Sequence, residues 1–421
     1  MIERQAARPE TDEAEPKLPA GLELSDLDPE FRENPHPRLD LLREAAPRYR
    51  EPTAPEGRIY LTKHCDVRAA LNDRALSKDP RKAPADSYIR SVAPKAVIDG
   101  TLPVTMIWMD DPEHRLYRGL VAQAFTPRAI EGRRAAIEGI VDGVLDGIGA
   151  REHFDALEDF GAIIPVRVIS EVLGLPQEDR ERFDAWARDL GFLSFLPKRT
   201  PEEDARLAQA GVALSFYLRD IIAKKREAPC DDLISGMIKA ELDGRRLSDD
   251  EIVPNCMLML VAGILTATDV IGNGVALLLQ NREQWEKLKA DPSLIKKAVD
   301  EILRYDPPLS TARRHVNEDA VVMGCPLKAG GYFSASLVAA NHDPETFPDP
   351  HRFDIARDAA AHTSFGGGAH YCIGAALAKL ELEIAFAKLA ARFPNLRLAG
   401  ESLRRKEIHG FRGYERVILC T

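Results

Sequence analysis

A long apolar run in the second half of the chain constrains the fold more than any other feature. Ser248 and Glu251 have the spacing of a helical capping box, and the apolar pattern that follows continues for about 30 residues, roughly 50 Å at 1.5 Å per residue. Its most apolar part, residues 252–268, is interrupted by Asp269 and then by Asn273. Because buried charges are rare in membrane spans, the run predicts a core helix rather than a transmembrane helix.

Helical patterns dominate the rest of the chain. We expect further helices over residues 114–124, over residues 293–305 after the Asp291-Pro292 start signal, and over residues 373–393. Strand patterns are weaker and cover residues 58–61, 320–323, 332–335 and 417–419. The segments 320–323 and 332–335 are expected to pair across the turn-rich sequence between them. These elements predict a mainly α (α+β) fold with small β-sheets at one side.

The N-terminal 25 residues are rich in Glu and Pro and are expected to form a flexible tail. They contain no apolar signal core and no membrane anchor. No linker or repeat is visible afterwards, so residues 26–421 are expected to form a single domain.

Charge and cysteine content narrow the function classes. The chain has 67 acidic and 57 basic residues among 421, a net charge of −10, which argues against general nucleic-acid binding. Its six cysteines form no CxxC pair, which argues against a zinc ribbon and fits a reducing compartment. We therefore expect a cytoplasmic protein, monomeric, that binds neither nucleic acid nor a membrane.

A glycine-rich stretch, SFGGGAHYCIGAALAKLELE, places Cys372 where a loop turns into a helix. A buried structural thiol is one interpretation. A nucleophile at a helix N-terminus is another, although its nearest base, His370, is poorly placed two residues away. The third is a thiolate ligand to iron, because glycines at 366–368 let the backbone approach a flat cofactor and donate N–H groups toward the sulfur.

The stretch resembles the haem-binding loop FxxGx(H/R)xCxG of the cytochrome P-450 family, and the matching residues are Phe365, Gly366, Gly368, His370, Cys372 and Gly374. The resemblance covers nearly the whole chain after the tail. It implies the fold of the soluble bacterial members, with haem b between the long central helix and the cysteine-loop helix. It further implies Cys372 as the axial ligand of the haem iron, with Phe365, Gly366 and His370 in contact with the haem.

A second motif, EILR, places Glu301 and Arg304 on one face of a helix. Alone it is common, but in this position it resembles the ExxR signature of the same family. The resemblance implies a buried Glu–Arg–Arg network, completed by Arg352 in DPHRFD, that holds the cysteine loop. Removing one partner of such a network would cost roughly 3–5 kcal/mol.

A third motif, DDPEHRLYRGLV, places His114 and Arg118 four residues apart on one helix face. A solvated surface face is the simplest interpretation of such a pair. The resemblance implies instead that both bind haem propionates together with Arg314, since carboxylates favour several charge-assisted donors. Arg313 competes with Arg314 for this role.

The segment AGILTATD departs from the family pattern (A/G)Gx(D/E)T. Ala262, Gly263 and Thr266 match and imply a place beside the haem, but Leu265 stands where the family has an acid. The acid normally helps to relay protons, which leucine cannot do. Asp269, one helical turn further, is either a substitute relay or a structural polar residue. Restoring the acid with Leu265→Glu is expected to change the coupling efficiency, that is, the share of reducing equivalents converted to product.

The resemblance implies an apolar substrate pocket over the haem. Its expected lining residues are Ile89, Val92, Ile98, Phe192, Leu193, Phe195, Leu258, Val261, Leu265, Leu309, Thr311 and Phe411. A separate electron donor of the ferredoxin type is expected, because the chain has no room for a fused redox domain. Its acidic surface could dock on basic residues such as Arg115 and Lys379.

The leading hypothesis is a haem-thiolate monooxygenase that inserts one oxygen atom of O2 into a small hydrophobic substrate by hydroxylation or dealkylation. A peroxide-using member of the same fold is the alternative that Leu265 motivates. A non-catalytic haem-binding protein and a thiol hydrolase without haem are two further alternatives.

Overall fold

The computed structural model describes residues 24–25, 27–51, 57–93, 95–100, 104–122, 125–193, 196, 199–242, 244–400 and 403–421. The expected tail, residues 1–25, therefore lies almost wholly outside the described residues. In this part of the chain the helices are α1 (Pro29–Glu33), α2 (His36–Ala45), α3 (His64–Asn72), α4 (Tyr88–Ser91), α5 (Lys95–Ile98), α6 (Glu113–Ala122), α7 (Pro127–Glu131), α8 (Arg134–Ile148), α9 (Ile163–Leu173), α10 (Arg180–Arg188), α11 (Pro201–Glu227), α12 (Leu233–Lys239), α13 (Asp249–Gln280), α14 (Arg282–Ala290), α15 (Ile295–Tyr305), α16 (Leu337–Asn341) and α17 (Ala375–Arg392). Short 3₁₀ or π turns are η1 (Pro80–Lys82), η2 (Met106–Trp108), η4 (Ala156–Gly161), η5 (Gln177–Asp179), η6 (Asp189–Leu193), η7 (Pro292–Leu294) and η8 (Gly368–His370).

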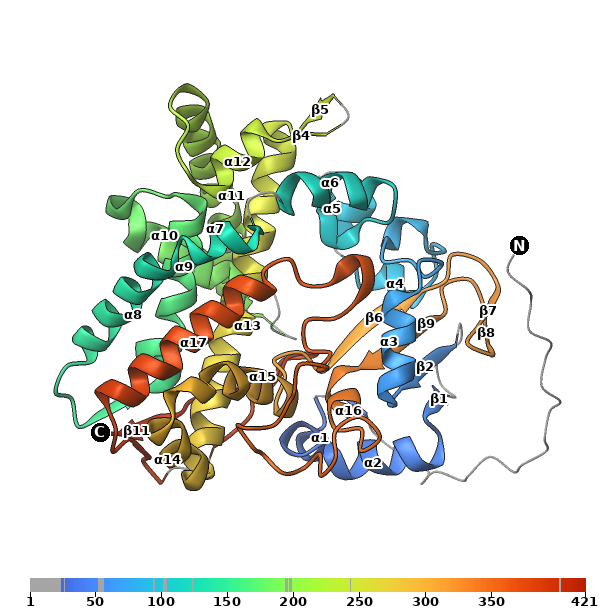
Figure 1. The fold of residues 1–421 in the computed structure, drawn as a ribbon. Coiled ribbons are helices and arrows are strands. Elements are labelled where there is room, and N and C mark those ends of the chain that lie inside the picture. Colours follow the sequence, from blue (N-terminus) through green and yellow to red (C-terminus); the bar gives the residue numbers. More distant parts are fainter. Residues whose placement is uncertain are drawn as a thin grey trace.

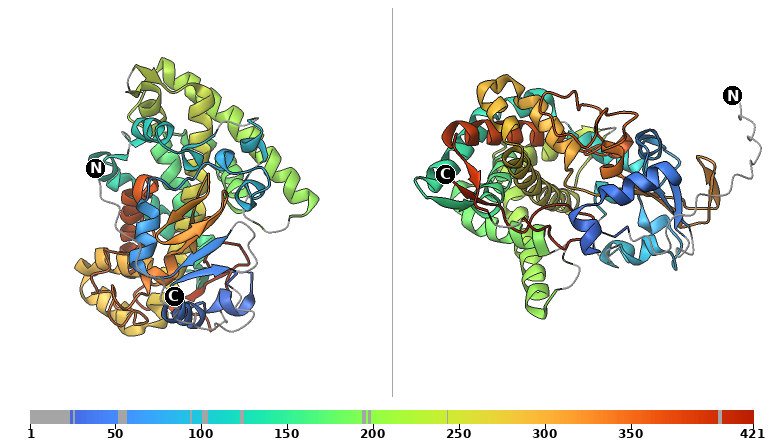
Figure 2. Two further views of the ribbon diagram at one scale, coloured as in Figure 1. Left: turned by 90° about the vertical axis from the view of Figure 1, so that its right-hand side faces the viewer. Right: turned by 90° about the horizontal axis from the view of Figure 1, so that it is seen from below.

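The strands are β1 (Arg48–Glu51), β2 (Arg58–Leu61), β3 (His153–Asp155), β4 (Glu241–Leu242), β5 (Arg245–Arg246), β6 (Thr311–His315), β7 (Ala320–Val322), β8 (Cys325–Leu327), β9 (Tyr332–Ser336), β10 (Arg397–Leu398) and β11 (Ile418–Cys420). They form a four-stranded sheet in the order β1-β2-β9-β6, a three-stranded sheet β10-β11-β3 and two hairpins. Figure 1 shows the helices gathered on one side and the four-stranded sheet with α2, α3 and α16 on the other. Seen from its own side, the sheet lies in front of the helices (Figure 2). The predicted mainly α fold with small sheets at one side is confirmed.

The predicted core helix is α13. Glu251 accepts a hydrogen bond from the Ser248 N–H at 2.9 Å, which closes the predicted capping box at its start. Among the described helices, α13 alone is long and apolar enough to cross a membrane, but 67% of its most apolar window is buried inside the protein. Helices α9, α11, α15 and α17 pack against it, as is typical of a core helix.

A glycine sets the distance between α13 and α17. A Cβ atom on Gly274 would lie 2.4 Å from Cζ of Phe386 in α17, so any other residue would displace this buried ring. This close approach fixes the cysteine-loop helix against the central helix, with the described sheet to one side (Figure 1).

The predicted pairing of residues 320–323 with 332–335 is wrong. Met323 and Gly324 both have positive φ, 52° and 76°, and make a two-residue turn, so Val322 pairs directly with Cys325 in the β7–β8 hairpin. Strand β9 instead pairs with β2 in parallel and with β6 in antiparallel register. The turn was hidden from sequence because methionine rarely adopts positive φ.

Candidate active site

The cysteine loop is built by two left-handed glycines. Gly366 has φ +72° and Gly368 has φ +64°, and a Cβ atom on Gly368 would lie 2.4 Å from the Leu71 carbonyl oxygen in α3. The Cys372 N–H donates to the Phe365 carbonyl at 2.9 Å, which closes the loop. The loop therefore presents Cys372 from a backbone that only glycine can form.

The Cys372 thiol sits between opposing influences. Burial raises the pKa of the Cys372 thiol, while the N–H of Gly374 and the guanidinium of Arg118 act in the other direction. Cys372 nevertheless has accessible surface, so its sulfur is open to a ligand although protein surrounds it. Cys420, the cysteine nearest the C-terminus, is in β11, where its Sγ lies 3.3 Å from Nδ1 of His153, and no glycine loop precedes it.

Beside the loop, five basic side chains form what we call the cationic cluster: Lys78, His114, Arg118, Arg314 and His370. The rings of His114 and His370 are 4.1 Å apart between centroids, and Arg118 donates to the Tyr371 carbonyl. Arg314 is 4% exposed and its Nη2 lies 3.5 Å from the Gly367 carbonyl oxygen. The structure thus brings the three predicted propionate ligands, His114, Arg118 and Arg314, together with His370.

Charge within the cationic cluster is poorly compensated. Burial lowers the pKa of Arg314 to about 10, and burial with the nearby guanidinium of Arg314 lowers the pKa of Lys78 to about 7. Burial and His114 lower the pKa of His370 to about 2. The carboxylate that opposes these shifts in all three is Asp110. Buried basic side chains with so little compensating negative charge favour binding of an anionic ligand.

Lys78 was not predicted. It lies in the loop between α3 and η1, its N–H donates to Asp110 Oδ1 at 2.8 Å, and its Nζ lies 5.7 Å from the centre of the Trp108 ring. Lys78 and its neighbours Ser77 and Asp79 form no recognisable motif. Its membership of the cationic cluster is therefore visible only in the folded structure.

Arg314 rather than Arg313 faces the cluster. Successive residues of a strand point to opposite faces, and along β6 this places Arg313 against His409, with Nη2 2.8 Å from Nε2 of that ring. Arg313 also lies over the Tyr88 ring at 5.7 Å.

On α13, Ala262 and Thr266 share the accessible face of the helix. The Thr266 hydroxyl donates to the Ala262 carbonyl at 2.7 Å, which leaves its oxygen able to accept a hydrogen bond. Leu265 is 0% exposed and does not share this accessible surface.

Asp269 is fully buried and holds an ion pair. Its Oδ1 lies 2.6 Å from Nζ of Lys406, and a Cβ atom on Gly413 would lie 2.1 Å from the same oxygen, so the backbone seals this carboxylate. Its Oδ2 has no hydrogen-bond partner. Burial raises the pKa of Asp269. The arrangement fits the structural interpretation of Asp269 better than that of a proton relay.

The buried network around Glu301 corrects one prediction. Arg304 binds both oxygens of Glu301, at 2.7 and 2.9 Å, and both side chains are 0% exposed. The third partner is Arg357, whose Nε lies 3.2 Å from Glu301 Oε1, and not Arg352. The side chain of Arg352 is 68% exposed and faces Asp354 at 3.8 Å. The loop turns back after Arg352, so the arginine five positions later reaches Glu301.

The expected pocket residues are only partly brought together. Leu309 and Phe411 form a β-bridge, and Leu258 and Val261 are half-buried on α13. Thr311 starts β6, Leu193 is 8% exposed at the end of η6, and Ile98 ends α5.

Two expected pocket residues point elsewhere. Ile89 packs with Ala83 and Tyr332 in a small separate cluster, and Val92 is 51% exposed. The side chain of Phe192 and all of Phe195 lie outside the described residues.

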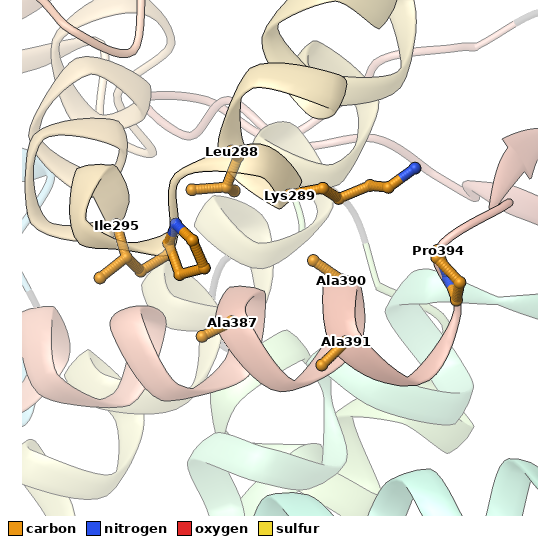
Figure 3. Close-up of a pocket in the computed structure, with 8 residues that line it drawn as sticks. Leu288, Lys289, Ile295, Ala387, Ala390, Ala391 and Pro394 are labelled. Carbon is orange, nitrogen blue, oxygen red and sulfur yellow. The ribbon is translucent and has the colours of Figure 1, made fainter.

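A surface groove of about 270 Å³ lies elsewhere, between α14, η7 and the second half of α17 (Figure 3). Leu288, Ile295 and Ala387 line it. Ala387 lies about 18 Å along the α17 axis from Ala375, the first residue after the cysteine loop. The groove is therefore distinct from the candidate site.

Comparison with known proteins agrees with this geometry. A model of the family described as cytochrome P-450 matches residues 187–407. The vitamin D(3) 25-hydroxylase of Pseudonocardia autotrophica is 40% identical over 373 residues, 88% of this chain and 89% of the relative. The 6-deoxyerythronolide B hydroxylase of Saccharopolyspora erythraea is 35% identical over 343 residues, 80% of this chain and 83% of the relative.

Solved structures agree as well. The myxobacterial CYP267B1 in complex with myristic acid has a TM-score of 0.84 and 36% identity, covering 94% of this chain and 98% of that one. The fold and loop define a haem protein in which a core helix faces a cysteine loop. This chain belongs to the cytochrome P-450 family. It is an oxidoreductase of the monooxygenase type with haem b as cofactor, so the alternatives of a thiol hydrolase and of a non-catalytic haem protein do not fit it.

The residues present suit haem b. Its two propionates would supply the negative charge that the cationic cluster lacks, and the glycine loop leaves the Cys372 sulfur accessible.

Proposed function

We propose that this chain hydroxylates or dealkylates a small hydrophobic organic molecule, using O2 and electrons from a separate ferredoxin. The observation that carries the proposal is the poorly compensated cationic cluster beside the accessible thiol of Cys372. The named activities of relatives, on vitamin D(3), on steroids and on 6-deoxyerythronolide B, favour an organic substrate with a largely apolar skeleton.

We assign the cofactor contacts as follows. Cys372 provides the thiolate ligand, Phe365, Gly366 and Ala262 lie against the porphyrin, and His114, Arg118, Arg314 and His370 hold the propionates. Bound haem supplies the redox chemistry that activates O2, and a thiolate ligand favours cleavage of the O–O bond. The N–H of Gly374 and the guanidinium of Arg118 stabilise the negative charge on the sulfur.

Thr266 would position a proton beside the site where bound haem activates O2. Because its hydroxyl hydrogen is donated to the Ala262 carbonyl, its oxygen would accept a hydrogen bond from an ordered water and so orient that water. Leu265 adds no acid to this path, so ordered water has to bring the protons that a family member with an acid would relay there. We assign Asp269 a structural role, through its ion pair with Lys406.

Apolar side chains from three segments would hold the substrate. Leu258 and Val261 on α13 and the bridged pair Leu309 and Phe411 are available on the described part of the chain. Burial of apolar surface excludes water and orients the substrate by shape rather than by charge.

The electron donor is expected to be a small acidic protein. Arg115 is exposed on α6 and suits such a surface. Lys379 suits it less, because its Nζ lies 2.7 Å from Oδ1 of Asp300. We further propose a cytoplasmic monomer whose residues 26–421 act as one domain.

The substrate class is tested by titrating the haem-loaded protein with a library of sterols, fatty acids and macrolides. The shift of the haem absorption band on binding is the readout. Product analysis with a ferredoxin and its reductase then identifies the reaction. Turnover with peroxide that exceeds turnover with O2 and ferredoxin would favour the peroxide-using alternative motivated by Leu265.

A further inference from the structure

We propose that His36, His342 and His351 form a binding site for one divalent transition-metal ion of the Zn²⁺ type, outside the haem site. One ligand nitrogen from each ring lies within 4.8 Å of the others. The three histidines come from separate segments: the first residue of α2, the residue after α16, and the loop that leads to Arg357. Neutral imidazole is the commonest protein ligand of such ions.

The ring nitrogens are poised as ligands. Nδ1 of His342 lies 3.1 Å from the Val338 carbonyl, so this nitrogen carries the hydrogen and Nε2 keeps its lone pair. That Nε2 is buried and has no hydrogen-bond partner, and the same holds for Nδ1 of His36. A buried polar atom without a partner costs free energy, and a metal ion would remove this cost at both rings.

The surroundings supply the orienting contact that metal-binding histidines usually have. Nε2 of His351 lies 2.8 Å from Oδ2 of Asp40, a carboxylate–histidine pair of the kind that fixes a ligand ring. The side chain of His351 is 48% exposed, which gives the ion a path from solvent and room for a water ligand. Three nitrogens with one water match a four-coordinate zinc site.

The positive charges closest to the three rings are compensated by carboxylates. The nearby cations Arg304 and Arg412 are each paired with a carboxylate, those of Glu301 and Asp306.

The cluster must close slightly to bind. At a Zn–N distance of 2.0–2.1 Å, ligands at tetrahedral angles lie about 3.4 Å apart, against an upper limit of 4.8 Å in the structure. The His342 and His351 rings are stacked with centroids 5.3 Å apart, whereas the His36 ring is tilted against that of His342 by 49° with centroids 4.2 Å apart. Binding therefore requires the rings to move closer, and His351, whose side chain is 48% exposed, is the ring with most room to do so.

Metal binding would affect the cysteine loop through the hydrogen-bond network of Arg304 and Glu301. Arg304 donates to the carbonyls of Asn341 and Pro350, the residues directly before His342 and His351. An ion at the three histidines would therefore fix two acceptors of the arginine that chelates Glu301. It would also tie α2 to this network.

The test uses the haem-loaded, tag-free protein after chelator treatment, titrated with ZnCl₂ by calorimetry, with zinc per chain measured after gel filtration. We expect one Zn²⁺ per chain and a higher thermal unfolding midpoint with zinc. His351→Gln, at the exposed ligand, should keep its haem and weaken zinc binding at least tenfold; His36→Gln should do the same.

The matched control is His153→Gln, which removes an exposed histidine near Cys420. It should bind zinc as the unchanged protein does. The proposal is overturned if the protein takes up no zinc at about 100 µM, if His351→Gln binds as tightly as the original, or if His153→Gln alone abolishes binding.

Discussion

Nε of Arg357 lies 3.2 Å from Oε1 of Glu301, a carboxylate that is 0% exposed and is also chelated by Arg304. Arg357 donates in addition to the carbonyls of Pro348, Asp349 and Arg352, so one guanidinium holds both the buried charge and the loop around it. Arg357 therefore links the buried Glu301–Arg304 pair to the loop that contains Pro348, Asp349 and Arg352.

Replacing Arg357 by alanine is expected to lower the free energy of unfolding by about 2–4 kcal/mol, because Glu301 loses a buried partner while Arg304 remains. Arg352→Ala is the control, since that side chain is 68% exposed and should change stability by less than about 0.5 kcal/mol. Urea unfolding of the haem-loaded proteins measures both. Equal losses in the two variants would contradict the assignment.

Thr266→Ala is expected to lower the product formed per electron consumed by at least about tenfold, because the proton-positioning hydroxyl is lost. Its stability should barely change, since the hydroxyl bonds only its own helix. Asp269→Asn should instead affect stability and leave the yield of product per electron almost unchanged. It weakens the buried pair with Lys406 and costs about 2–4 kcal/mol.

Measuring NADPH use, product and unfolding for both variants separates the roles. If Asp269→Asn is as stable as the original protein but as uncoupled as Thr266→Ala, Asp269 belongs to the proton path.

Lys78 predicts a pH dependence of haem retention. We propose that Lys78, a member of the cationic cluster, also holds a propionate. Its pKa of about 7 without haem means that, as the pH rises above neutrality, this charge has to be regained when haem binds, so haem is held less tightly. Haem transfer to excess apomyoglobin should therefore become several-fold faster between pH 6 and pH 8.5. Lys78→Gln should lose haem about three- to tenfold faster at pH 6, with a flatter pH profile.

Lys224→Gln, at an exposed position on α11, is the control and should follow the original protein. A Lys78→Gln profile as steep as the original would remove Lys78 from the cofactor site.

Glu381 predicts a pH dependence of stability. It lies in α17, 4% exposed, with no hydrogen-bond partner for Oε1, and burial raises its pKa from 4.5 to about 8. The folded protein thus holds a proton that the unfolded chain releases between these pH values, so the free energy of unfolding falls as the pH rises from about 5 to 8.

Glu381→Gln should remove roughly 2–4 kcal/mol of this pH-dependent loss, because the amide is always neutral. Denaturant unfolding at pH 5 and pH 8.5 measures it, with exposed Glu202→Gln as the control. An unchanged slope in Glu381→Gln would show that the carboxyl is ionised in the folded state.

Local chemistry explains which features were predictable from sequence. The capping box at Ser248 and the i, i+3 pair of Glu301 and Arg304 depend on residues close in sequence, and both were found. The glycine loop was found because its backbone requires glycine. The cationic cluster was found only where helical spacing or the family pattern marked it.

The features that were missed depend on chain reversals that leave no periodic signal. Arg357 reaches Glu301 only because the loop turns back after Arg352, which no periodic pattern in the sequence marks. Lys78 and the β7–β8 turn at Met323 have no motif. The histidines that we assign to a metal site lie in three distant segments and meet only in the fold.

The carbon monoxide difference spectrum of the reduced protein tests the central claim most directly. We expect the band typical of thiolate-ligated haem in the original protein and in Cys420→Ser, and its loss in Cys372→Ser with the fold retained by circular dichroism. A thiolate band that persists in Cys372→Ser, or that disappears in Cys420→Ser, would contradict the assignment of Cys372 as the haem ligand.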